Sequence, residues 1–176
     1  VYDSIKNLDP KSQKISEMER NILRWRQNNL NNFSSGSVMQ EIAEHPDIKD
    51  AVIQYNLKSF FDKISTRLNN YIHGNGIDYY NSNVIAYDDN YLQSQMTVLF
   101  DDLRMITVTF LFLLSLCSPQ AIMSTDYEDH FDLSLTPPEG CQYWVAPFIV
   151  EFFRDNLDII DKNCLEYLKN KTEMVF

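Results

Sequence analysis

The chain is poor in glycine, cysteine and histidine. Only four of its 176 residues are glycine, whereas β-rich folds with many tight turns use glycine often. The three cysteines are an odd number, lie far apart and form no Cys-x-x-Cys pair. This pattern predicts a reducing compartment, with no disulfide framework and no cysteine metal site. We therefore expect a cytoplasmic protein with little β-structure.

Positive charge is also scarce. Lysine and arginine total 15 against 25 acidic residues, which gives a formal net charge of −10. Proteins that bind duplex DNA regardless of sequence carry a basic patch or a basic overall balance. The acidic balance argues against that class, although it is compatible with a small local site for one phosphate. Affinity for nucleic acid is then expected to be weak and salt-sensitive.

Long apolar runs are absent. The most apolar segment, MITVTFLFLLSLC at 105–117, is shorter than the roughly 20 residues that span a bilayer, so it predicts a buried core helix and no membrane partner. The start, Val1-Tyr2-Asp3-Ser4, has neither the basic flank nor the apolar run of a signal peptide. A length of 176 residues fits one domain, so we expect a single domain over residues 1–176. Because the sequence lacks an initiating Met, we expect that this domain is excised from a longer chain.

What the chain does have is helical periodicity and an ample supply of core residues. Hydrophobic residues make up 44% and aromatic residues 13%, and the apolar positions recur at spacings of three and four. No internal repeat, heptad run, GxGxxG or P-loop is evident. We expect an all-α helical bundle of four main helices with long connecting loops. The main helices are predicted at 12–31, 47–71, 90–117 and 146–169, with a short helix at 38–45.

One segment at the end of the second predicted helix concentrates groups suited to chemistry. Arg67, Asn69, Asn70 and His73 precede a Gly-Asn-Gly run at 74–76, which is a strong signal for the end of a helix. The two amides lie four and three residues before the histidine and can share its helical face. At about 100° per residue, Arg67 is offset from that face by roughly a third of a turn, which its long side chain can bridge.

These groups suit the cleavage of a ribose phosphodiester. A neutral imidazole at His73 can take the proton from a 2′-hydroxyl or give one to the leaving oxygen. A guanidinium at Arg67 can bind phosphate oxygens and stabilise the charge of the transition state, while Asn69 and Asn70 orient the imidazole or hold the sugar. No metal or other cofactor is required. Because one histidine does not easily act as both acid and base, a homodimer that brings two such helix ends together is expected.

The run from Arg67 to His73 (RLNNYIH) resembles the Arg-x4–6-His motif of the HEPN superfamily. That resemblance implies a small helical bundle with the motif at a helix end, usually at a dimer interface. It also implies a metal-independent endoribonuclease of a toxin–antitoxin or phage-defence system, with an RNA substrate and an antitoxin or other protein partner. The chain departs from the family at Leu68, since a polar residue commonly follows the arginine directly.

Other interpretations of the same residues remain open. Several HEPN proteins are non-catalytic, so the alternative function is a binding or scaffold module for a protein partner or a nucleotide. His73 can simply complement the C-terminal dipole of the helix, and Arg67 can pair with Asp62 on the same helix. Asn69 and Asn70 can serve only to end the helix.

His130 lies in an acidic stretch with Asp126, Glu128 and Asp132, and the combination has the composition of a metal site. Flexible acidic loops commonly have the same composition, so no metal site is predicted there.

Overall fold

The structure is a computed structural model that describes residues 16–27, 35–72, 74, 76–77, 80 and 89–176. It divides into two compact units, Val1–Lys49 and Asp50–Phe176, and each is described by itself. The prediction of a single domain therefore stays a prediction.

The first unit contains α2 (Glu17–Arg26) and α3 (Ser35–Glu44). Ser16 caps α2, because its hydroxyl accepts a hydrogen bond from the Glu19 N–H at 3.2 Å. In return the Glu19 carboxylate accepts from the Ser16 N–H at 2.8 Å, which completes a capping box. The helix predicted at 12–31 thus begins only at Glu17 and ends at Arg26; residues 12–15 and 28–31 lie outside the described part.

The helix predicted at 47–71 is broken into α4 (Lys49–Gln54) and α5 (Leu57–Ile72). The break falls at Asn56, whose φ of 49° lies in the left-handed region that interrupts a helix. The predicted stop is confirmed, because α5 ends at Ile72 and Gly74 follows with a φ of 63°.

The helix predicted at 90–117 is confirmed as α7 (Asp89–Cys117). Its buried residues all lie from its middle onward, beginning at Asp102. The turn η1 (Pro119–Ile122) follows directly, because Pro119 lacks the N–H that would continue the helix. None of the helices that the structure describes is long and apolar enough to cross a membrane.

The C-terminal part contains more, and shorter, helices than predicted. The helix expected at 146–169 is divided into three pieces, and the stretch 118–143 between the third and fourth predicted helices contains short helical turns. The pieces are α9 (Pro147–Asn156), η3 (Leu157–Ile159) and α10 (Cys164–Thr172), and the turns are η1, α8 (Asp126–Asp132) and η2 (Cys141–Tyr143). The described residues are therefore all-α, with isolated bridges in place of strands, but a bundle of four continuous helices is not observed in them.

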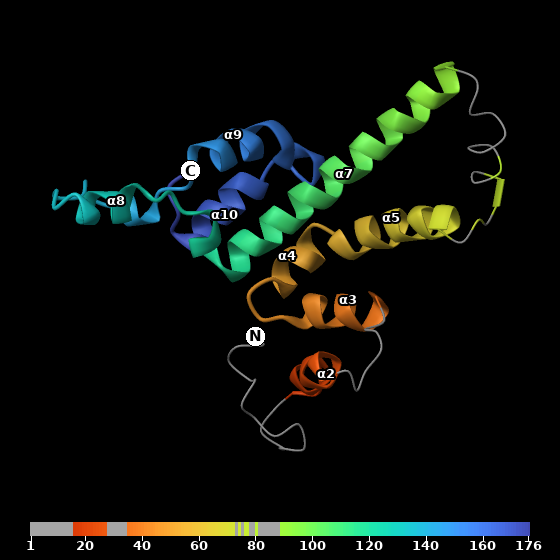
Figure 1. Cartoon of the computed structure of the whole chain (residues 1–176), viewed down its shortest axis with the longest axis horizontal. Helices are drawn as coiled ribbons and strands as arrows, with labels where there is room; N and C mark the ends of the chain where they lie inside the picture. Colours follow the sequence, from red (N-terminus) through yellow and green to blue (C-terminus); the bar gives the residue numbers. More distant parts are fainter. Residues whose placement is uncertain (1–15, 28–34, 73, 75, 78–79, 81–88) are drawn as a thin grey trace. The chain divides into compact units, whose positions relative to one another are not determined.

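The core of the second unit forms around α7, against which α5, α9 and α10 pack (Figure 1). Phe112 of α7 is fully buried and meets the ring of Tyr55 edge-to-face at 5.6 Å between centroids. Tyr55 in turn meets Tyr167 of α10 edge-to-face at 5.5 Å. Such edge-to-face pairs add to the free energy gained by burying the rings. α7 is thus the central helix against which α5 is fixed.

Candidate functional site

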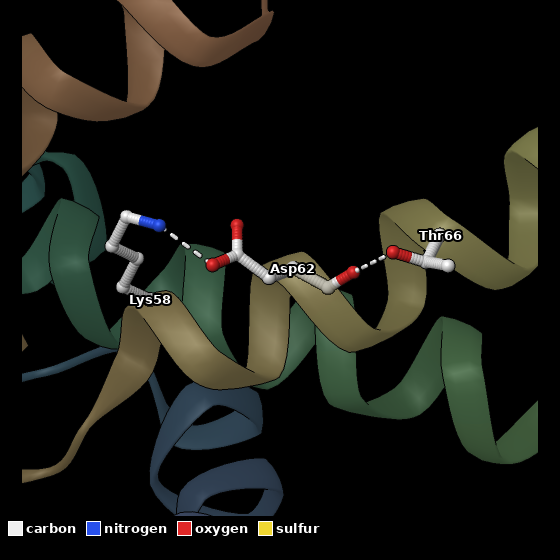
Figure 2. Close-up of polar contacts among 3 residues, drawn as sticks. All are labelled: Lys58, Asp62 and Thr66. Atoms are coloured by element: carbon white, nitrogen blue, oxygen red, sulfur yellow. Dashed lines mark hydrogen bonds and ion pairs between the residues drawn. The ribbon is translucent and has the colours of Figure 1, made fainter.

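Three exposed polar residues of α5 bond to one another within that helix. Lys58 Nζ lies 2.6 Å from the Asp62 carboxylate, and the Thr66 hydroxyl donates to the Asp62 carbonyl oxygen at 2.8 Å, as Figure 2 shows. The carboxylate of Asp62 is thus paired one turn back along α5. The interpretation that Arg67 pairs with Asp62 is wrong.

Arg67 instead forms an ion pair with Asp102 of α7. Its Nη2 donates to Oδ1 of Asp102. The carboxylate side chain is 10% exposed and the arginine side chain 33% exposed. A nearly buried carboxylate is costly unless a cation or several donors compensate it, so this arginine is its compensation. The contact fixes the last two turns of α5 to the middle of α7.

The ion pair leaves part of the guanidinium available. Nε of Arg67 is buried and has no hydrogen-bond partner among the described residues, while a third of the side chain faces solvent. A guanidinium carries five N–H donors in a fixed fork, and the bond to Asp102 uses a donor on only one of its nitrogens. The group can therefore contact a second anion, although the charge of Asp102 weakens its attraction for one.

The remaining predicted site residues are only partly described. Asn69 is exposed and Asn70 half-buried on the last turn of α5, and Leu68 is half-buried between them and Arg67. His73 lies outside the described residues. The structure thus brings Arg67 and the two amides to one helix end, and the placement of the histidine beside them stays a prediction.

The other histidines have local partners. His130 Nδ1 lies 2.6 Å from the Asp126 carbonyl oxygen, within the short helix α8. His45 Nδ1 lies 3.8 Å from a carboxylate oxygen of Asp47. Over the described ranges, no group of three or more His, Cys, Asp or Glu side chains could hold a metal ion.

The buried thiols are poor candidates for nucleophiles. Cys141 and Cys164 are buried, and Cys117 is exposed. Burial, with a smaller contribution from the Asp161 carboxylate, raises the pKa of the Cys164 thiol to about 12. The thiolate is the reactive form of cysteine, so Cys164 is a core residue.

Two features escaped the sequence analysis. The first is Asp102, which looked like one of two acidic residues before an apolar run and gave no sign of a partner 35 positions away. The second is a shallow groove of about 370 Å³ on α9 and the C-terminal segment. Its lining is mostly apolar, with one acidic and one basic side chain: Trp144, Val145, Pro147, Val150, Glu151, Arg154 and Val175.

Comparison with known proteins gives no relative. No protein-family model, no curated protein and no solved structure matches the chain.

Proposed function

We propose that this chain is a HEPN-like, metal-independent endoribonuclease that acts through Arg67 and His73 in a homodimer. The observation that carries the proposal is the environment of Arg67. Arg67 lies about one turn from the end of α5, its guanidinium is oriented by Asp102, and its side chain is one-third exposed. A fixed arginine with a partly exposed side chain beside a helix stop suits the recognition of a phosphate.

In the proposed reaction the 2′-hydroxyl of a ribose attacks the adjacent phosphorus. The bond from phosphorus to the 5′-oxygen of the next nucleotide breaks, so the products are a 2′,3′-cyclic phosphate and a free 5′-hydroxyl. One His73 accepts the proton of the 2′-hydroxyl and the His73 of the second copy protonates the leaving 5′-oxygen. Arg67 binds the non-bridging oxygens and offsets their growing charge.

Asp102 has a positioning role in this account. It holds one edge of the Arg67 guanidinium, which restricts the rotamers of a long side chain and so reduces the entropy lost when a phosphate binds. The same carboxylate lowers the attraction for that phosphate. Weak, salt-sensitive binding of RNA is the expected result for a chain of net charge −10.

The test is the cleavage of a labelled RNA by the purified full chain in excess EDTA. We expect products with a 2′,3′-cyclic phosphate, and we expect His73→Ala to abolish them while the circular dichroism spectrum stays unchanged. His45→Ala is the matched control, because it removes another histidine that lies outside the site. Undiminished cleavage by His73→Ala would overturn the proposal.

Arg67→Lys separates catalysis from folding. Lysine retains a positive charge to pair with Asp102 but lacks the planar fork that contacts two phosphate oxygens. We expect this variant to keep the melting temperature within a few degrees and to lose most of the cleavage rate. Full activity in Arg67→Lys would contradict the role given to the guanidinium.

The second candidate is a non-catalytic HEPN-like module that binds a protein partner or a nucleotide. The ion pair with Asp102 favours it, because a guanidinium that compensates a nearly buried carboxylate has a sufficient structural reason to be present. It predicts no cleavage by the purified protein and unchanged partner binding in His73→Ala.

A further inference from the structure

A line of apolar side chains is exposed along α7. The members are between 41% and 61% exposed, and their spacings are four, three, four, three and four residues. They are Leu92, Met96, Leu99, Leu103, Ile106 and Phe110, and we call them the α7 seam. These spacings are those of the a and d positions of a heptad, which form one stripe along a helix that packs against another helix.

The seam is distinct from the face by which α7 joins its own core. Val108, Phe112 and Leu116 are buried in that core, and at 100° per residue they lie more than 100° around the helix from the middle of the seam. The part of α7 from Val108 onward therefore has two apolar faces. The heptad is hard to see in the sequence because other apolar residues, such as Val98, Phe100 and Val108, lie between its members and blur the period.

An exposed stripe of this kind requires a partner. Monomeric soluble proteins rarely expose large contiguous apolar patches, and heptad patterns indicate a coiled coil when they extend over about three to four heptads. The half-buried Leu113 and the exposed Cys117 continue the same spacing. The seam itself, from 92 to 110, thus extends over nearly three heptads, and the same spacing continues to 117.

The seam is complementary to itself. It is symmetric about position 101, so an antiparallel second copy sets Leu92 against Phe110, Met96 against Ile106 and Leu99 against Leu103. The ring of Phe110 then faces a leucine rather than a second phenylalanine, so that each pair combines side chains of compatible volume. A surface that matches its own two-fold copy is what an isologous dimer needs.

The distribution of charge along α7 also permits dimerisation, although each chain has a net charge of −10. Residues 92–100 include no charged side chain. The positions that flank the seam are mostly uncharged, as at Gln93 and Thr107, and the flanking carboxylate of Asp102 is paired with Arg67 of its own chain. No unpaired like charges therefore meet across the seam.

We propose that the α7 seam packs against the α7 seam of a second copy in antiparallel orientation. This proposal identifies the surface through which the dimer of the proposed function forms. It rests on the proposed function only for the role of the dimer in catalysis. Since the test reads the oligomeric state, either proposal can fail without the other. A dimer that does not cleave RNA would contradict the proposed function alone, and a chain that cleaves RNA as a dimer that the seam variants leave intact would contradict the seam alone.

The test is sedimentation equilibrium of the full chain at about 1 to 100 µM, where a micromolar dimer dissociates measurably. We expect the natural chain to dimerise and the double variant Leu99→Glu, Leu103→Glu to weaken the dimer by at least about 100-fold, because it places four charges in the seam. The matched control is Val98→Glu, which adds a charge at an exposed position of the same helix outside the seam and leaves the dimer intact.

Circular dichroism shows whether the glutamate variant folds. If it does not fold, the double variant Leu99→Ala, Leu103→Ala takes its place in the sedimentation measurement. We expect this variant to form a weaker dimer than the natural chain. A natural chain that stays monomeric throughout would overturn the proposal. Equal dimerisation of the natural and seam-variant chains would overturn it too.

Cross-linking reads the orientation. A Leu92→Cys chain is mixed under mild oxidation with a Phe110→Cys chain, and the second chain carries a longer tag so that mixed and self-linked products differ in size. We expect mixed disulfides between the two variants. If each variant cross-links only with itself, the antiparallel pairing is overturned.

Discussion

Arg67 on α5 is paired with Asp102 on α7, and this contact joins the two helices through residues that are 35 positions apart in the sequence. The sequence predicts a catalytic role for this arginine. In the structure its positive charge also compensates the nearly buried carboxylate of Asp102. Any loss of activity in an Arg67 variant must therefore be separated from a loss of stability.

The ion pair is expected to stabilise the fold. Arg67→Ala leaves Asp102 buried without its cation, which costs about 3–5 kcal/mol in a fully buried pair; we expect about 1–3 kcal/mol here, since a third of the arginine is exposed. Urea unfolding of Arg67→Ala, Asp102→Ala and the double variant gives the coupling free energy.

Lys58 and Asp62 supply the matched control on the same helix. Both side chains are more than half exposed, so their coupling is expected to be about 0.3–0.5 kcal/mol, as for other exposed i,i+4 pairs. Equal coupling free energies for the two pairs would show that Arg67 stabilises the nearly buried carboxylate of Asp102 no more than one exposed charge stabilises another.

Two phenylalanines of α7 should differ sharply. Phe112 is fully buried and Phe110 is 61% exposed. Phe112→Ala should cost about 3–5 kcal/mol in the free energy of unfolding, because it removes core contacts and leaves a cavity. Phe110→Ala should change the unfolding of the monomer little and weaken self-association. The measurement is urea unfolding at low concentration together with sedimentation; similar unfolding losses would refute the division of α7 into two faces.

Stability should fall at alkaline pH. The Cys164 thiol has a pKa near 9.0 when the chain is unfolded, and burial raises this pKa to about 12 in the fold. Between these values the unfolded chain has lost a proton that the folded chain retains. The free energy of unfolding therefore decreases as pH rises, with a slope from this group of at most about 1.4 kcal/mol per pH unit.

Urea unfolding from pH 8 to 11 measures this slope. Tyr55, whose pKa burial also raises to about 12, adds to it. Cys164→Ala should flatten the pH dependence, whereas Cys117→Ala, at an exposed position, should not. A slope unchanged by Cys164→Ala would argue against a buried, protonated thiol.

Local signals predicted local structure well. The stop of α5 before Gly74 and both ends of α7 follow from glycine, aspartate and proline at fixed positions. The break at Asn56 was missed because apolar periodicity runs across it from Val52 to Phe60, and no glycine or proline marks the left-handed residue.

Long-range relations were not readable from the sequence. The ion pair of Asp102 could be recognised only in the fold, which places its carboxylate beside Arg67. The α7 seam became visible only when exposure separated Leu103 and Ile106 from the buried Val108 and Phe112. In an all-apolar stretch the residues alone do not say which face the core takes and which is left for a partner.

The most direct measurement of the central claim compares an RNA oligonucleotide with its all-2′-deoxy counterpart of the same sequence, both in excess EDTA. Attack by the 2′-hydroxyl predicts that the purified chain cleaves only the RNA, that the product carries a 2′,3′-cyclic phosphate, and that His73→Ala cleaves neither. Cleavage of the deoxy strand at a similar rate, or intact RNA after incubation with a folded dimer, would contradict the claim.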